Sequence, residues 1–253
     1  MNNQPLRPTE EPLRELAETY LQAGQGLHLG ILDDVAVRVR DLTPDADRLA
    51  VCLTDDGDLH IHGIWSAPSA QLGERRVLVT ADTAGPDTVL ALTEITSDLE
   101  MVVPSLYLQT WGLEHTRPCE EHGCCSWVTL PPANRLATLT TLVHAHIPDA
   151  EALVCPVERH EEKVLVGFDR ILRAGGEPVP FPCPGCAPNA TRPWPLSVTW
   201  QLIALLGQIY ALPHLRSRHM TPCLNSASEH GVPLWQITLP WQDHRPVAAA
   251  AAH

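Results

Sequence analysis

The sequence predicts an α+β fold in two packed parts, on the basis of three observations. Apolar residues alternate on both sides of one tight turn near residue 56, apolar stripes recur at helical spacing within the first hundred residues, and the character of the chain changes after residue 112. We expect residues 1–112 to form an acidic antiparallel sheet with packed helices. Residues 113–246 form a second, Cys- and His-rich part, and residues 247–253, with their alanine run, are a disordered tail.

Helix and strand patterns alternate in the first part. Thr9 fits the cap of a first helix, and Gly24 is a suitable C-terminal stop. Three valines then alternate with other residues over 35–40, which predicts a half-buried strand. A further strand is expected over 75–81. A helix is expected from Asp87 to Glu100, because apolar residues step there by three and four: Leu92, Ile95, Leu99 and Val102.

A β-hairpin is predicted around Asp55-Asp56-Gly57. A three-residue loop, with Gly57 in the left-handed position, pairs Leu53 with Leu59 and Val51 with Ile61. A two-residue loop would pair Leu53 with His60 and mix the two faces, so the hydrophobic pattern selects the three-residue loop.

The second part is predicted to contain helices and short strands. A helix is expected over 134–146, a strand near 164–168 and a last short strand over 235–241. Residues 197–212 are apolar on nearly every side, which is typical of a helix buried in a core.

The strongest chemical pattern is a group of cysteines with metal-ligand spacing. Cys183-Pro-Gly-Cys186 is a short-spaced pair, and Cys119, His122, Cys124 and Cys125 lie together in a second segment. Zinc often takes its four ligands as two such pairs from separate loops. We therefore predict a structural zinc ion bound by Cys119, Cys124, Cys183 and Cys186, which ties the two loops of the second part together.

Several alternatives to this ligand set remain open. His122 or Cys125 can take the place of Cys124, and an iron–sulfur cluster can use the same cysteines. Free thiols, or disulfides in an oxidising compartment, would leave no metal site. Cys155 and Cys223 stand alone and are expected to be buried thiols.

Weaker patterns suggest other chemistry. Asp149, Glu161 and Lys163 follow in outline the spaced acid, acid-x-lysine signature of a metal-dependent nuclease superfamily, in which carboxylates hold a divalent ion and the lysine positions water. The hairpin places Cys52, His60 and His62 on one face, a second candidate metal site. His144 and His146 are two residues apart on a helix and are not expected to point the same way.

Charge and composition limit the function classes. The first hundred residues hold 18 acidic and 7 basic residues, which argues against a large basic nucleic-acid-binding face; Arg216, Arg218 and His219 form only a local patch. No apolar stretch is long enough to cross a membrane and no signal peptide is evident, so a cytoplasmic location is expected. Recognisable catalytic motifs are missing. The expectation is therefore a zinc-stabilised interaction or regulatory protein with a protein partner, and a metal-dependent nuclease or hydrolase is the alternative.

Overall fold

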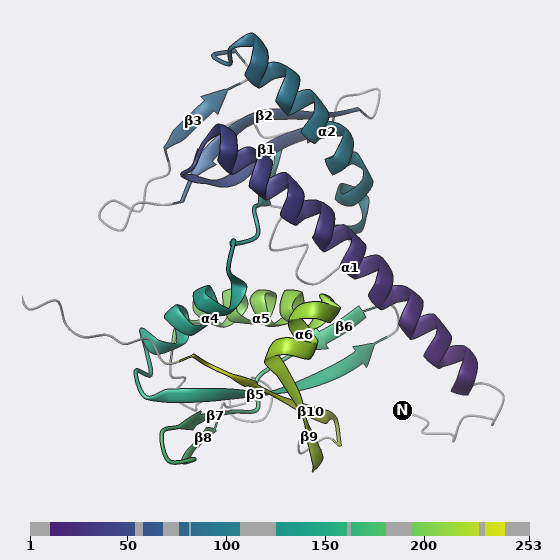
Figure 1. The fold of residues 1–253 in the computed structure, drawn as a ribbon, viewed down its shortest axis with the longest axis vertical. Helices are drawn as coiled ribbons and strands as arrows, with labels where there is room; N and C mark the ends of the chain where they lie inside the picture. The colour runs from purple at the N-terminus through teal and green to yellow at the C-terminus, as the bar shows by residue number, and fades with distance from the viewer. Residues whose placement is uncertain are drawn as a thin grey trace, which may run out of the picture.

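The computed structural model describes residues 11–53, 58–67, 76–80, 82–106, 125–160, 163–180, 194–227 and 231–240. These residues form helices and two antiparallel sheets, so the α+β class is confirmed (Figure 1). The helices are α1 (Glu11–Leu42), α2 (Pro86–Leu106), α4 (Arg135–His144), α5 (Leu196–Ala211) and α6 (Pro213–His219). The first sheet contains β1 (Ala46–Leu53), β2 (Leu59–Ser66), β3 (Val77–Thr80) and β4 (Cys125–Thr129). The second contains β5 (Ala150–His160), β6 (Lys163–Val166), β7 (Arg170–Arg173), β8 (Pro178–Pro180), β9 (Met220–Ala227) and β10 (Pro233–Thr238).

The first helix is much longer than the sequence pattern predicts, and the predicted end at Gly24 is wrong. α1 continues to Leu42 and includes the segment 35–40 that was expected to be a strand. Val35 and Val39 are one helical turn apart and buried, whereas Val37 is 58% exposed. Of the three glycines inside this helix, Gly26 lies against α5, where an added Cβ would be 3.4 Å from the carbonyl oxygen of Ala211, whereas Gly24 and Gly30 face open space.

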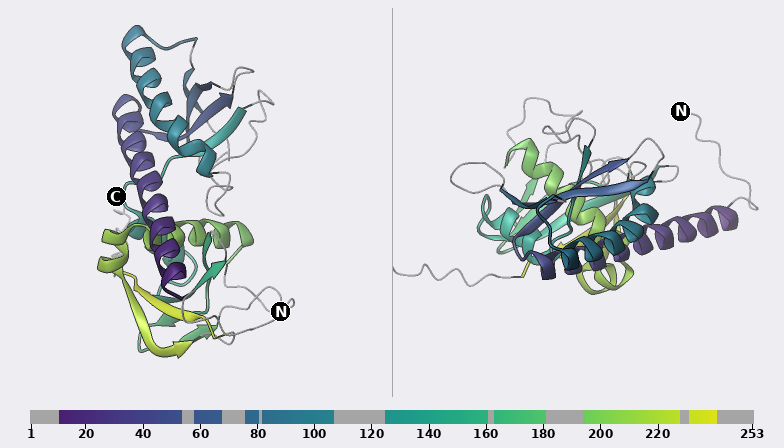
Figure 2. Two further views of the ribbon diagram at one scale, coloured as in Figure 1. Left: turned by 90° about the vertical axis from the view of Figure 1, so that its right-hand side faces the viewer. Right: turned by 90° about the horizontal axis from the view of Figure 1, so that it is seen from above.

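The first sheet has the strand order β3-β2-β1-β4, with α1 and α2 packed on one face (Figure 2). The predicted hairpin register is confirmed, since Leu53 pairs with Leu59 and Val51 with Ile61. Residues 54–57, which hold the predicted loop, lie outside the described residues. The four apolar residues predicted to line the inner face of α2 are all buried: Leu92, Ile95, Leu99 and Val102. β4 lies beyond residue 112 in the chain but pairs with β1, so the first sheet includes a strand from the range expected to form the second part.

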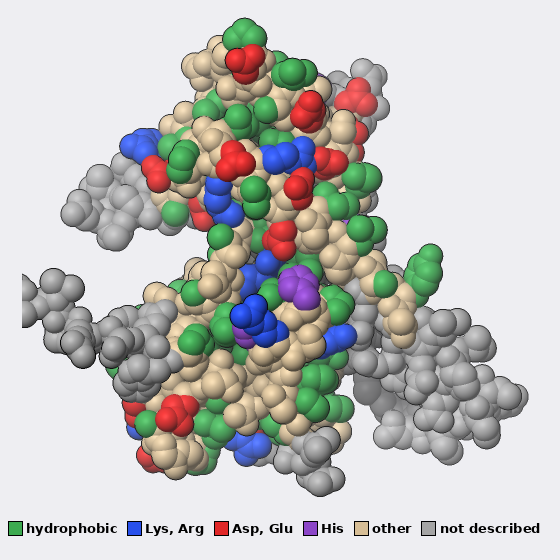
Figure 3. Space-filling view, viewed as in Figure 1, with side chains coloured by type: hydrophobic (Ala, Val, Ile, Leu, Met, Phe, Trp, Pro, Cys, Tyr) green, Lys and Arg blue, Asp and Glu red, His purple; other side chains and the backbone are tan. Residues whose placement is uncertain are grey.

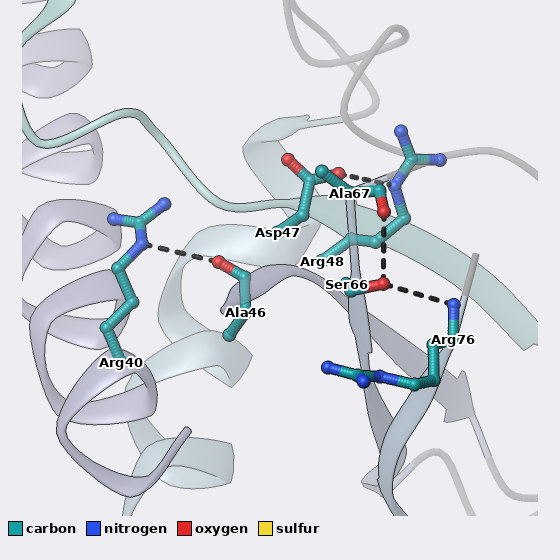
Figure 4. A network of polar contacts seen from close by, with 7 residues as sticks. All are labelled: Arg40, Ala46, Asp47, Arg48, Ser66, Ala67 and Arg76. Carbon is teal, nitrogen blue, oxygen red and sulfur yellow. Dashed lines mark hydrogen bonds and ion pairs between the residues drawn. The ribbon is translucent and has the colours of Figure 1, made fainter. Parts of the chain in front are cut away.

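Polar contacts fix the chain where α1 leads into the first sheet (Figure 4). The Arg40 side chain donates to the carbonyl oxygens of Ala46 (3.3 Å) and Pro131 (2.8 Å), so it joins the end of α1 to β1 and to the segment after β4. At the other edge, the backbone N–H of Arg76 donates to the Ser66 hydroxyl at 3.0 Å. Burial lowers the pKa of the Arg40 guanidinium and the Arg135 charge lowers it further, while Asp47 and Asp33 raise it.

The second sheet has the order β8-β7-β5-β10-β9, with β6 paired to β5. α4 begins as predicted: the Asn134 side chain accepts from the backbone N–H of Ala137 at 2.9 Å, a typical N-cap contact. α5 is largely buried, as predicted, but its first turns are exposed and Trp200 keeps 45% of its surface in solvent. Its Leu202, Leu206 and Ile209 belong to the core of the second sheet, whereas Ala204 and Ala211 pack in the core of the first. One helix therefore contributes to both hydrophobic cores.

None of the described helices alone combines the length and the apolar character needed to cross a membrane. By length and composition, α5 and α6 meet that criterion only as a pair, across a bend of 104°.

Candidate functional site

The four predicted zinc ligands, Cys119, Cys124, Cys183 and Cys186, lie outside the described residues, and so does His122. The zinc site therefore stays a prediction. Within the part of the chain that the structure describes, no three His, Cys, Asp or Glu side chains are arranged to hold a metal ion.

Cys52 is in a disulfide bond, which sequence reasoning did not predict. It is buried against Trp127, whose ring also lies beneath the Arg48 guanidinium at 5.9 Å. A disulfide sulfur is not a thiolate, so the candidate metal site of Cys52, His60 and His62 lacks its sulfur ligand. Sequence reasoning does not reveal such a bond, because its two cysteines are far apart in the chain and only the pairing of strands brings them together.

The register of the first sheet indicates the partner of Cys52. The β1–β4 ladder places Cys125 directly opposite Cys52. Residues directly opposite in an antiparallel pair have Cβ atoms about 4.5–5.5 Å apart, close to the separation that a disulfide requires. We therefore predict a bond between Cys52 and Cys125. Such a bond removes Cys125 from the alternatives for the zinc site.

This disulfide can be counted chemically. In protein purified without reductant and unfolded, we expect iodoacetamide to modify at least two fewer cysteines than the eight modified after reduction, as measured by mass spectrometry. Cys125→Ser should free Cys52 for modification. As a control, Cys223→Ser should leave Cys52 protected, because Cys223 is a free thiol. Modification of all eight cysteines without reduction would contradict the bond.

The two isolated cysteines are poor nucleophiles. Cys155 is fully buried in the core of the second sheet, as predicted, and burial strongly raises the pKa of its thiol, with smaller contributions from Asp169 and Cys223. Cys223 is only half-buried, and burial again is the main cause that raises its pKa. Both thiols are therefore protonated near neutral pH, which does not favour catalysis or metal binding.

The residues of the nuclease alternative do not all come together. Asp149 immediately precedes β5, and its carboxylate lies 3.6 Å from Arg173. Lys163 pairs with His160 at the far end of the same strand. Eleven residues of strand separate the two backbones by about 35 Å, which no pair of side chains can bridge. Glu161 lies outside the described residues. Asp149 and Lys163 therefore do not share a metal site.

The two histidines near the end of α4 point in different directions, as predicted. His144 is buried, and its Nε2 lies 2.8 Å from the carbonyl oxygen of Ala150, so this side chain links α4 to the start of β5. His146 is exposed. The buried histidine therefore has a structural role.

A buried ionic cluster joins α1, α4 and α5. The Arg135 guanidinium of α4 donates to both carboxylate oxygens of Asp33 in α1, at 3.1 and 2.5 Å, and to the side-chain oxygen of Gln208 in α5 at 2.8 Å. Arg135 is only 6% exposed. Sequence reasoning missed the cluster, because Asp33 and Arg135 are far apart in the chain and no local pattern links them.

The outward side of α1 and α2, which we call the outer helical surface, carries apolar and acidic side chains together. Leu27 and Val37 of α1 and Leu90 and Met101 of α2 are large apolar residues that are each more than half exposed. Acidic residues lie between them: Asp34, Glu94 and Asp98. Arg38 bridges the two helices by pairing with Asp34 at 2.9 Å and with Asp98; the Asp98 hydrogen bond is the main cause that raises the pKa of Arg38.

Comparisons with known proteins give no further assignment. No protein-family model, no curated protein and no solved structure matches the chain.

Proposed function

We propose that the protein is a non-catalytic interaction or regulatory protein, with a protein partner and with a structural zinc ion in its second part. The outer helical surface carries this proposal. Several large apolar side chains exposed on one surface are typical of a binding site. A partner that covers them removes their unfavourable contact with water.

The composition of the surface indicates the chemistry of the partner. Apolar contacts at the centre of an interface supply most of the binding energy, while charges around them select the partner and its orientation. Leu90 and Met101 lie on the stripe of α2 that also contains Glu94, because residues at intervals of three, four and seven share one helical face. A partner that fits this stripe is an amphipathic segment with apolar residues and basic flanks.

The zinc ion has a supporting role in this proposal. The predicted ligand pairs lie in segments that are rich in Pro and Gly or in polar residues, which offer little apolar surface for a core of their own. A structural zinc ion supplies about 10–16 kcal/mol of apparent binding free energy, which is enough to order such loops. The proposal therefore assigns the ion to stability and leaves binding to the helices.

The binding part of the proposal can be tested with model peptides. A fluorescent amphipathic helix of Leu and Lys should bind the protein, whereas a matched helix of Leu and Glu should not, because the outer helical surface is acidic. In anisotropy titrations, the double variant Leu90→Asp/Met101→Asp should weaken binding of the Lys peptide at least tenfold. Val77→Asp is the matched control, since Val77 is an exposed apolar residue of β3. Equal weakening by both variants, or no binding of the Lys peptide, would contradict the assignment.

A further inference from the structure

A small basic surface lies on α6, in a protein whose formal net charge is −13. His214 and Arg218 are one helical turn apart and both exposed, so they point outward together. Arg216 is two residues from each of them and lies on the other side of the helix, where its guanidinium is 5.0 Å from the centre of the Tyr210 ring of α5. We call the outward pair, His214 and Arg218, the α6 basic patch.

The two residues of this patch also act on a third basic residue, His219. Burial lowers the pKa of the neighbouring His219, and the charges of Arg218 and His214 lower it further. Both charges that act on His219 are therefore positive. A cluster of like charges has an unfavourable self-energy, which a bound acidic group relieves.

The α6 basic patch lies on the same face of the molecule as the acidic outer helical surface. Figure 3 shows Arg and His side chains over α6 in the lower half, and Asp and Glu side chains, with Lys or Arg side chains among them, over α1 and α2 in the upper half. The side view in Figure 2 places all three helices along one side of the molecule. The two surfaces of opposite charge are therefore presented in the same direction by one chain.

We propose that the outer helical surface binds the α6 basic patch of a second copy of the chain. A two-fold axis in the plane of this face, perpendicular to the long axis of the molecule, places each basic patch on the acidic helices of the other copy. Two equivalent contacts then form at once and the assembly closes as a dimer, as in isologous interfaces. This inference rests on the proposed function, because it names an occupant for the same surface.

The dimer also provides a means of regulation. α6 has only seven residues and is about 10 Å long, so each contact is small. Small contacts between exposed charges give weak association that falls with salt. A partner with an amphipathic basic segment competes with the second copy for the outer helical surface, so the dimer blocks part of this surface until a partner displaces it.

The test uses the full chain and charge reversal on each side of the contact. At low ionic strength and high protein concentration, sedimentation equilibrium should give a mass near twice 27.7 kDa, and high salt should return it to the monomer. Arg218→Glu alone and Glu94→Arg alone should each be monomeric, because each replaces attraction by repulsion at both contacts. A mixture of the two variants should form the dimer again, since both contacts of the mixed pair join opposite charges. Arg76→Glu, a change at an exposed arginine immediately before β3, should behave as wild type.

Three results for the oligomeric state overturn the inference. These are a wild-type monomer at every concentration in low salt, a dimer that survives both reversals, or a mixture that stays monomeric. Binding of a single-stranded oligonucleotide by the monomer, lost in Arg218→Glu, would assign the patch to nucleic acid and overturn it as well. Binding of the Lys peptide by a wild-type chain that never dimerises would leave the proposed function standing while this inference fails.

Discussion

Replacing Arg135 with methionine should lower the free energy of unfolding by about 2–3 kcal/mol. The change leaves the Asp33 carboxylate without its paired guanidinium and the Gln208 side-chain oxygen without this donor. Breaking a fully buried ion pair on one side costs about 3–5 kcal/mol. The expected loss is smaller because the Asp33 side chain keeps 35% of its surface exposed. Urea denaturation with a two-state fit measures the difference.

Two further variants separate the buried charge from lost packing. Asp33→Leu/Arg135→Met removes both charges, so it should be less destabilised than the sum of the two single variants, by about 1 kcal/mol or more. Arg38→Met is the control. It breaks the ion pair between Arg38 and Asp34, which is of similar length but lies nearer the surface, and it should lower the free energy of unfolding by at most about 1 kcal/mol. An Arg135→Met loss no larger than that of Arg38→Met would show that the cluster contributes little to holding α1, α4 and α5 together.

The variant Cys183→Ser should lower stability by several kcal/mol through loss of zinc. Wild-type protein purified without added metal is expected to contain about one zinc per chain by elemental analysis. Removing one thiolate weakens the grip on the ion, and binding free energy at such a site is also folding free energy. The melting temperature of the variant should therefore fall, and its zinc content should fall with it.

The matched control is Lys163→Ala, which should change stability by no more than about 0.5 kcal/mol and leave the zinc content unchanged. Neither variant nor wild type should cleave nucleic acid in the presence of magnesium or manganese. A folded wild-type chain without zinc or iron would contradict the metal prediction. Metal-dependent cleavage by wild type that disappears in Lys163→Ala, with an unchanged melting point, would instead make the nuclease alternative the leading one.

Local patterns predicted the elements whose contacts are close in sequence. The hairpin register follows from alternation around one turn, because a slip by one residue would place Leu53 opposite His60 and mix the two faces. α2 and α5 follow from apolar spacing over several turns. The same reasoning failed in α1, where Val35, Val37 and Val39 fit the period of a strand over a short window. Packing decided for the helix, because Leu29, Leu32, Val35 and Val39 form one continuous buried stripe.

The residues of the candidate site divide in the same way, into those that a local pattern predicts and those that only the fold brings together. The cysteine spacing near residues 120 and 185 is local, so the sequence alone predicts the zinc ligands, although they lie outside the described residues. The outer helical surface was missed because half of it lies on α1 beyond Gly24. The sequence pattern predicted that the helix ends at Gly24 and that a strand follows over 35–40. Sequence reasoning named Arg216, Arg218 and His219 as a local basic patch. The outward pair of His214 and Arg218, and its position on the same face as the acidic helices, required the fold.

By itself, the sequence determined the α+β class, the first hairpin with its register, the helices α2 and α5, and the acidic character of the first part. These depend on interactions over a few residues and on composition. Only the tertiary structure decided the length of α1, the place of β4 beside β1, the disulfide at Cys52 and the Asp33–Arg135–Gln208 cluster. The last three join residues that are distant in the chain, and α1 has its full length because its buried side packs against such residues. Their free energy comes from burial and pairing that exist only after the elements have packed, so no local pattern records them.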